Sequence, residues 1–250
     1  MVKIMVAMVL FMLSKLVFGT EQVIDLQLKN LSLKQYQYSP AIAEDKRISF
    51  EHEGITESYF FYRPENWRQQ MPVLIALHGA GRSGASMIDA WKNSAEKYGF
   101  IVIAPNGRGN RWDPARDDSA FIHAAIPHAL NNLQIQISQI YLFGHSSGAL
   151  KALALAATHP AEFTSVVAHA GTLPQISNHP LLSADIPKPK VGIYLGDSDH
   201  IFSVESARTT ISWFSNSGFS TSLFVLKNHS HWYYEDFDRI NESAWNFMSR

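Results

Sequence analysis

The chain has 250 residues, which is enough for one large α/β domain or two small ones, and its 46% of hydrophobic residues can form a real core. A formal net charge of −1, with lysine and arginine scattered along the chain, gives no electrostatic reason to expect nucleic acid as a partner. The absence of cysteine excludes disulfides, thiol nucleophiles and cysteine metal sites.

The first 19 residues have the pattern of a secretory signal peptide. Met1–Lys3 is a short positive start, and an unbroken apolar run covers Ile4–Leu13. This run is too short for a membrane span, which needs about 20 apolar residues, and Lys15 interrupts it. We therefore expect cleavage after Gly19 and a secreted or periplasmic protein with no stable membrane insertion. The alternative is an uncleaved N-terminal membrane anchor.

The rest of the chain is expected to form a surface segment and a single domain. Residues 20–45 are polar with mixed signals and predict an N-terminal surface segment, whereas residues 46–250 predict one α/β domain. At the start of that domain, Arg47–Glu53 and Glu57–Tyr62 are expected to be two short antiparallel strands.

Apolar runs then alternate with amphipathic segments. The runs are typical of parallel strands buried on both faces, and they cover Val73–Leu77, Ile101–Ala104, Ile140–Phe143, Ser165–Ala168, Val191–Leu195 and Ser222–Leu226. Apolar residues at helical spacing between and after them predict helices over Met87–Tyr98, Phe121–Leu133, Val204–Phe214 and Phe237–Phe247. This alternation predicts a mostly parallel, doubly wound sheet with helices on both faces. Ligands bind such sheets at the carboxyl ends of the strands.

A glycine-rich loop, LHGAGRSG, follows the first central strand. Glycines let the backbone approach a ligand closely. The backbone N–H of Gly79 or Ala80 is therefore a candidate donor to a developing oxyanion. His78 is expected to orient this loop rather than to transfer protons.

A second loop follows the strand Ile101–Ala104 and is expected to overhang the same edge of the sheet. Trp112 in this loop either stacks on an aromatic or sugar-linked acyl group or packs in the core, and the sequence favours neither role. Asp118 is expected to cap the helix that starts at Ser119.

The pattern G-x-S-x-G occurs in the sequence GHSSG, between the strand Ile140–Phe143 and the Ala/Leu-rich segment Ala149–Ala157. The pattern alone is common, but a strand before it and a helix after it predict a nucleophile elbow. Such a turn lifts the central serine clear of the sheet and places it at a helix N-terminus, where negative charge is favoured. Ser146 is thus the predicted nucleophile, and the N–H of Ser147 is the second predicted oxyanion donor.

A serine nucleophile needs an imidazole to take its proton and a carboxylate to orient that imidazole. In serine hydrolases built on such a sheet, the acid and then the base follow the serine along the chain. The strand Val191–Leu195 ends in GDSDH, which offers Asp197 and Asp199. Asp199 is favoured because it lies beyond the glycine turn, and Asp197 is expected to cap the turn through its side chain.

The base is expected after the strand Ser222–Leu226. His229 and His231 both lie there, and their spacing alone does not separate them. These two histidines and His200 could also gather around a metal ion. No fourth ligand is evident, so no metal site is predicted.

With these residues in place, the chain resembles the poly(3-hydroxybutyrate) depolymerase and feruloyl esterase group of α/β-hydrolases from about Ser58 to Met248. The resemblance rests on LHGAGRSG, APNGRG, WDPARDD, YLFGHSSGAL, GDSDHIF and HSHWYY. It implies the α/β-hydrolase fold, and the G-x-x-D turn of the group matches Gly196 and Asp199. The last segment is also similar to the catalytic His-Ser-Tyr-Tyr segment of the esterase D family, which implies His231 as the base.

The sequence thus predicts a serine carboxylic-ester hydrolase that works through an acyl-enzyme, with a small or oligomeric ester as substrate. His78, Trp112 and His145 are the predicted substrate-contacting residues. No cofactor is expected, since a Ser-His-Asp triad is chemically complete. The alternatives are a peptidase or lactonase with the same triad, because fold and triad do not choose among these substrates. A non-catalytic binding protein that keeps the fold is a third reading.

Overall fold

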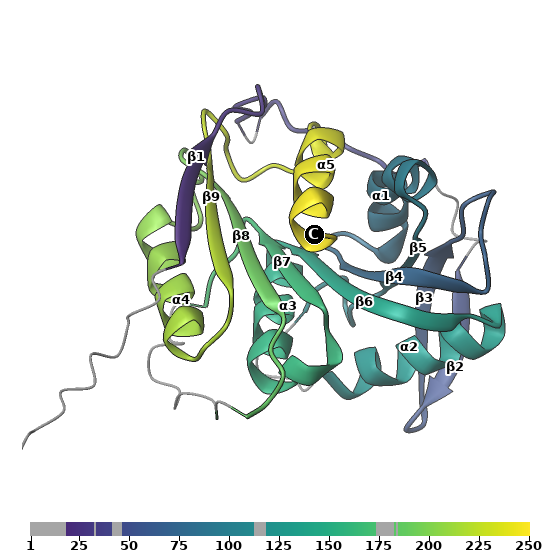
Figure 1. Cartoon of the computed structure of the whole chain (residues 1–250). Helices are drawn as coiled ribbons and strands as arrows, with labels where there is room; N and C mark the ends of the chain where they lie inside the picture. The colour runs from purple at the N-terminus through teal and green to yellow at the C-terminus, as the bar shows by residue number, and fades with distance from the viewer. Residues whose placement is uncertain (1–18, 33, 42–46, 113–118, 174–182, 184) are drawn as a thin grey trace, which may run out of the picture.

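A computed structural model describes residues 19–32, 34–41, 47–112, 119–173, 183 and 185–250. The predicted signal segment up to Phe18 and the predicted cap at Asp118 lie outside these described residues. Nine strands of the described chain form one sheet, with the helices packed against its two faces (Figure 1).

The strands and helices alternate along the chain as the sequence predicts. The strands are β1 Thr20–Ile24, β2 Ile48–His52, β3 Ile55–Tyr62, β4 Gln70–Leu77, β5 Ile101–Pro105, β6 Gln136–His145, β7 Ser165–His169, β8 Lys190–Gly196 and β9 Thr221–Leu226. The helices are α1 Gly84–Tyr98, α2 Ser119–Leu133, α3 Ser147–Thr158, α4 Val204–Asn216 and α5 Phe237–Met248, with a short 3-10 helix, η2, at Pro160–Glu162.

The strand order is β1-β9-β8-β7-β6-β4-β5-β3-β2. The pairs β2/β3 and β3/β5 are antiparallel, whereas the pairs from β1 across to β5 are parallel. The mostly parallel sheet with helices on both faces is therefore confirmed. Because parallel strands end at one edge, the loops after β4, β6, β8 and β9 meet there.

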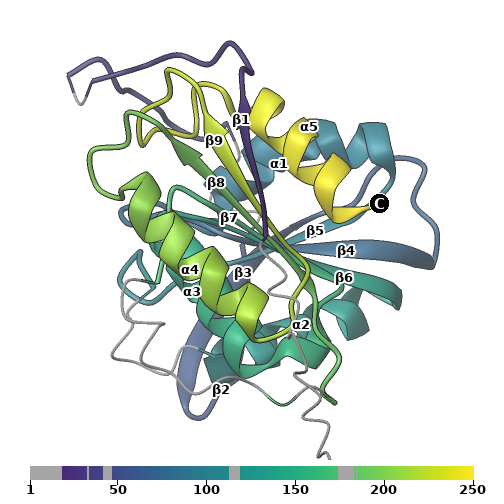
Figure 2. The ribbon, with the colours of Figure 1, turned by 60° about the vertical axis from the view of Figure 1, so that its left-hand side comes forward.

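Successive side chains of a strand point to opposite faces, which gives the sheet two cores. In β4, Val73, Ile75 and Leu77 pack in the core that α2, α3 and α4 cover. Leu74 and Ala76 pack in the core that α1 and α5 cover. Figure 2 shows these two helical layers on either side of the sheet. Continuous apolar runs are required because both faces of each central strand are buried.

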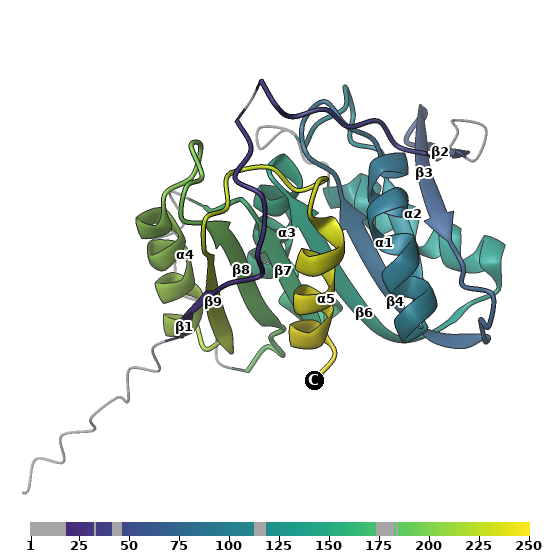
Figure 3. The same ribbon diagram turned by 90° about the horizontal axis from the view of Figure 1, so that it is seen from above.

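The segment 20–45 differs from the surface segment expected from its polar composition. Thr20–Ile24 forms the edge strand β1, which pairs in parallel with β9 from Thr20 opposite Ser222 to Ile24 opposite Leu226 (Figure 3). Four of its five residues are exposed. An edge strand with solvent on its outer side needs few apolar residues, so its sequence resembles a loop. Of the helices in the described part of the chain, none is long and apolar enough to cross a membrane.

Candidate active site

Ser146 occupies the turn between β6, which ends at His145, and α3, which begins at Ser147. Its backbone has φ 53° and ψ −117°, a sparsely populated conformation for a residue with a side chain. A Cβ at Gly144 would lie 2.1 Å from the carbonyl oxygen of Gly148, so the turn requires glycine there. The N–H of Ser146 donates to the carbonyl of His169 at 3.0 Å. Close packing and this hydrogen bond hold the strained residue in place.

Three segments bring a serine, a histidine and an aspartate together beside this turn. The hydroxyl of Ser146 lies 2.9 Å from Nε2 of His231, and Nδ1 of His231 lies 2.9 Å from Oδ2 of Asp199. His231 comes from the loop after β9, and Asp199 comes from the turn after β8. With Asp199 ionised, Nδ1 carries the proton, so Nε2 accepts the hydrogen bond from the serine. This is the geometry of a serine activated by an oriented imidazole.

Both oxygens of the Asp199 carboxylate have hydrogen-bond partners. Its Oδ1 accepts hydrogen bonds from the backbone N–H groups of Ile201 at 2.8 Å and Phe202 at 3.0 Å. Burial favours a raised pKa for Asp199, but the hydrogen bond and charge of His231 and the two N–H groups outweigh it, and the net pKa is lowered. Asp199 is therefore an anion near neutral pH, which suits it to stabilise an imidazolium.

The competing aspartate and histidine have other positions. Asp197 is exposed, and its carboxylate accepts from the N–H of Asn228 at 3.0 Å and the hydroxyl of Ser198 at 2.9 Å. Asp197 thus connects the turn after β8 to the loop after β9, a structural role similar to the capping role predicted for it. His229 is buried with its ring 5.5 Å from that of His169. Neither residue contacts Ser146 by a hydrogen bond among the described residues.

His145 lies beneath the nucleophile and is buried. It is 3% exposed, and its ring stacks on Tyr233 with centroids 5.1 Å apart. Its Nδ1 lies 3.0 Å from Nδ1 of His169, so one ring donates and the other accepts. Burial, reinforced by the neighbouring histidines, holds the pKa of both rings well below the ordinary value. The predicted substrate contact at His145 is therefore corrected to a neutral support under the site, because the side chain is almost fully buried.

His78 is equally buried and holds the glycine-rich loop. Its Nε2 accepts a hydrogen bond from the N–H of Gly107 at 2.9 Å, so Nδ1 carries the proton and donates to the carbonyl of Gly79 at 2.8 Å. Burial lowers the pKa of His78 to about 4, so the ring is neutral. The expectation that His78 orients the loop agrees with this geometry. A direct substrate contact does not, because the side chain is 0% exposed.

Two backbone carbonyls of this loop accept hydrogen bonds from side chains. The carbonyl of His78 accepts from the indole N–H of Trp112 at 3.0 Å, and that of Gly79 accepts from the His78 ring. In a trans peptide the N–H points opposite to the C=O, so these bonds also aim the N–H groups of Gly79 and Ala80.

The predicted oxyanion donors lie on two elements. The loop after β4 offers the backbone N–H groups of Gly79 and Ala80. Ser147 is the first residue of α3, where N–H groups lack partners within the helix. The structure thus offers Ser147, together with Gly79 or Ala80, as the pair for an oxyanion.

Trp112 lies in the core. Its side chain is 3% exposed and stacks on Phe121 of α2 at 6.2 Å. The structure resolves the choice that the sequence leaves open in favour of packing, and the predicted substrate contact is corrected. Its indole acts on the site through the hydrogen bond to the His78 carbonyl.

Sequence reasoning missed an arginine clamp that attaches the N-terminal segment to the site. The Arg82 guanidinium donates to the Tyr38 carbonyl and to the Tyr36 hydroxyl, both at 2.9 Å. Tyr36 in turn stacks on Trp232, next to the proposed base, with ring centroids 4.1 Å apart. The two tyrosines in an otherwise polar segment were the available signal, but nothing in the sequence shows where that segment returns.

Among the described residues, only one group of three possible metal ligands lies close enough together to hold an ion, and it contains none of the predicted catalytic residues. It consists of His123, His159 and Glu162. The sequence-based grouping of His200, His229 and His231 does not form such a cluster in the described chain. His231 is instead engaged by Asp199 and Ser146.

Comparison with known proteins agrees with this fold. The profile of a family described as alpha/beta hydrolase fold matches residues 72–192. An acetylxylan esterase from Coprinopsis cinerea is 32% identical over 50% of this chain and 37% of its own length. A feruloyl esterase B from Neurospora crassa is 30% identical over 45% of this chain and 43% of its own length. The chain thus spans less than half of the length of these two curated relatives.

The solved structure of a poly(3-hydroxybutyrate) depolymerase from Bordetella parapertussis superposes with a TM-score of 0.56 at 21% identity. The match covers 82% of this chain and 90% of that one. This structure supports the α/β-hydrolase fold, which the chain has. The sequence relatives, which include a poly(3-hydroxyalkanoate) depolymerase C from Paucimonas lemoignei, confirm the resemblance to the depolymerase and feruloyl esterase group.

Proposed function

We propose that this chain of α/β-hydrolase fold is a serine carboxylic-ester hydrolase with Ser146 as nucleophile, His231 as base and Asp199 as acid. The observation that carries the proposal is the continuous pair of 2.9 Å hydrogen bonds from the strained serine to a buried, ionised aspartate. The sequence relatives named as esterases support ester chemistry.

In the proposed acylation step, the oxygen of Ser146 attacks the ester carbonyl while Nε2 of His231 takes the hydroxyl proton. The carbonyl oxygen becomes an oxyanion that accepts hydrogen bonds from the backbone N–H of Ser147 and from that of Gly79 or Ala80. Collapse of this intermediate breaks the bond to the alcohol oxygen, and His231 returns the proton to that oxygen. The products are the free alcohol and an acyl group on Ser146.

Deacylation repeats these events with water as the nucleophile. His231 takes a proton from the water as its oxygen attacks the acyl carbon, and the proton then passes to the Ser146 oxygen as the acid leaves. Throughout, the Asp199 carboxylate faces the transient imidazolium and keeps its orientation. The cycle needs no electron acceptor or further group.

The test is hydrolysis of p-nitrophenyl acetate and butyrate by purified protein, together with labelling by a fluorophosphonate probe. We expect Ser146→Ala to abolish turnover and labelling. Ser198→Ala removes an exposed hydroxyl from the turn that carries Asp199, so it is the matched control and should keep both. Equal background rates for the parent and Ser146→Ala across short acyl chains would contradict the proposal.

A peptidase or lactonase with the same triad is the competing assignment. All three reactions pass through an acyl-serine, so the triad does not distinguish them. The relative rates on ester, lactone and peptide substrates, measured with one preparation, separate these classes. We propose that esters of small or oligomeric alcohols are cleaved fastest. Exclusive cleavage of peptides would overturn this ranking while leaving the triad in place.

We also propose that the chain is exported and cleaved after Gly19. The support is the short positive start and the apolar run Ile4–Leu13. Cleavage there would make Thr20, the first residue of β1, the new N-terminus and keep the edge strand intact. Intact mass measurement of protein recovered from the periplasm or medium tests this. A mass that still contains Met1–Gly19 would instead support a retained anchor.

A further inference from the structure

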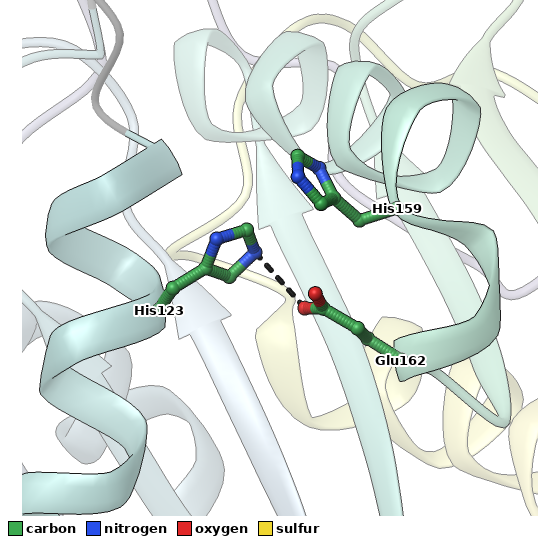
Figure 4. A group of neighbouring side chains, drawn as sticks. All are labelled: His123, His159 and Glu162. Carbon is green, nitrogen blue, oxygen red and sulfur yellow. Dashed lines mark ion pairs between the residues drawn. The ribbon is translucent and has the colours of Figure 1, made fainter.

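A second cluster of histidine and carboxylate lies at the far end of α3. His159 follows the last residue of α3, Glu162 ends η2, and His123 projects from α2. Figure 4 shows the three side chains gathered together, with a dashed line from a ring nitrogen of His123 to the carboxylate of Glu162. The Nε2 of His123 lies 2.9 Å from Oε2 of Glu162, and the two imidazole rings meet edge to face with centroids 4.4 Å apart.

The lone pair of His159 is directed by its neighbour. The hydroxyl of Thr158 donates to the carbonyl of Ala154 at 2.9 Å, so its oxygen accepts from Nδ1–H of His159, also at 2.9 Å. A neutral His159 ring therefore keeps its lone pair at Nε2. Fixing one ring nitrogen with a hydrogen bond while the other binds is the usual arrangement of a histidine metal ligand.

The spacing of the three donors suits a small divalent cation. One donor atom from each residue lies within 4.8 Å of the other two. A tetrahedral zinc ion with bonds of about 2.0–2.1 Å holds its ligands about 3.3 Å apart. The side chains of His123 and Glu162 are 27% and 42% exposed, so they can rotate the remaining distance. The same exposure lets water take a fourth position.

We propose that His123, His159 and Glu162 form a binding site for a divalent transition-metal ion, with Zn²⁺ the best match. Two imidazoles and one carboxylate are borderline ligands that suit Zn²⁺ better than Ca²⁺ or Mg²⁺, which prefer oxygen alone. His159 and Glu162 are three residues apart on one short turn whose first position is Pro160, and this restricts the backbone between them. His123 supplies the ligand from a different helix.

The ion would fasten α2 to the end of α3 and not take part in ester chemistry. The helix α3 has 12 residues, so roughly 18 Å of helix separates Ser146 from His159. An ion that binds only the folded chain stabilises it by mass action.

The test is titration of the EDTA-treated chain with ZnCl2 by calorimetry, with the visible spectrum of the Co²⁺ form as a second readout. We expect one ion per chain, a rise in Tm on binding, and a Co²⁺ spectrum typical of four-coordination with nitrogen ligands. His159→Gln and Glu162→Gln should each weaken Zn²⁺ binding by about 100-fold or more. Thr158→Val removes the hydroxyl that holds Nδ1 of His159 but no metal ligand, so it should weaken binding by about tenfold.

His200→Gln is the matched control, because His200 lies beside His231 and belongs to the alternative histidine group near the triad. It should leave Zn²⁺ affinity unchanged. The far-UV circular dichroism and the Tm of His159→Gln and Glu162→Gln in EDTA should be close to those of the parent, which verifies that both variants fold. The proposal is overturned if the parent binds no Zn²⁺, if the cluster variants bind it as the parent does, or if His200→Gln alone removes binding. None of these outcomes depends on whether the chain is an esterase.

Discussion

A histidine and a carboxylate lie side by side near each end of α3, and the two pairs have the same separation. At the N-terminal end, Nδ1 of His231 lies 2.9 Å from Asp199, and at the other end Nε2 of His123 lies 2.9 Å from Glu162. The first pair is 4% and 0% exposed, whereas the second is 27% and 42% exposed. The difference between the two ends is therefore burial, not distance.

Burial decides what each pair can do. Around Asp199 the low dielectric strengthens the interaction with His231, and the two backbone N–H groups leave the carboxylate a single orientation. Around Glu162 water screens the charge, so the pair adds little to stability and remains able to exchange a partner. A fixed pair suits proton transfer, and an open pair suits capture of an ion.

The largest expected effect is at the buried end. His231→Ala removes the proposed base and should lower kcat for p-nitrophenyl butyrate by on the order of 10⁶-fold, as loss of a triad histidine does elsewhere. The control is His229→Ala, whose ring faces His169 and should cost far less. If His229→Ala proved the more damaging change, the base would have to be reassigned.

Next comes the acid. Asp199→Ala leaves His231 without its orienting partner and should lower kcat by on the order of 10⁴-fold. Asp197→Ala is the matched variant two residues away, on the exposed side of the same turn, and should retain most activity. Steady-state kinetics of both at pH 7 measures the contrast. Comparable losses at the two positions would mean that the turn, not the carboxylate of Asp199, is what matters.

The support of the glycine-rich loop should matter less than the triad. His78→Leu removes the hydrogen bond to the Gly79 carbonyl and should lower kcat by on the order of 10²-fold with little change in KM, because oxyanion donors act mainly on the transition state. Trp112→Phe removes only the bond to the His78 carbonyl, which is worth about 10-fold or less. A change in KM alone would indicate a substrate-binding role instead.

Stability should fall at acid pH because the buried end holds neutral histidines. Burial depresses the folded-state pKa of His78 to about 4, and those of His145 and His169 also lie below the ordinary value of about 6.5. Between these limits the unfolded chain binds more protons, so the stability present above pH 6.5 is lost as the pH falls through the folded values.

For His78 alone this loss is on the order of 3 kcal/mol between pH 6.5 and pH 4. Urea unfolding at pH 7, 6 and 5 measures how the free energy of unfolding changes with pH, which gives the number of protons taken up on unfolding. His169→Gln should lower that number by up to one. A free energy of unfolding that does not change over this range would mean that the three rings have ordinary pKa values in the folded state.

The smallest effect belongs to the open end. In metal-free buffer, Glu162→Gln should change the free energy of unfolding by about 0.5 kcal/mol or less, because the lost pair is exposed to solvent. Thermal unfolding with and without EDTA measures this. A large loss without metal would show that the two ends are alike, and the comparison would fail.

Sequence patterns predicted the fold well where burial is two-sided. The apolar run Val73–Leu77 is continuous because both faces of β4 are covered, and the same holds for β7 and β8. The edge strand β1 escaped this reasoning because one side of it faces solvent. The predicted site residues Ser146, Asp199 and His231 meet in the structure, since each follows a strand that ends at the same edge of the sheet.

The sequence by itself determined the residues that local order can specify: a serine between a strand and a helix, an acid after a glycine turn, and two candidate histidines. Spacing left His229 and His231 open, and the family resemblance implied His231. The tertiary structure places His231, and not His229, within hydrogen-bond reach of Ser146, because side chains two residues apart in a loop can face different partners. It also decided that His78, His145 and Trp112 are buried supports, and that His123 lies beside His159 and Glu162. Those decisions depend on contacts between segments far apart in the chain, which no local spacing encodes.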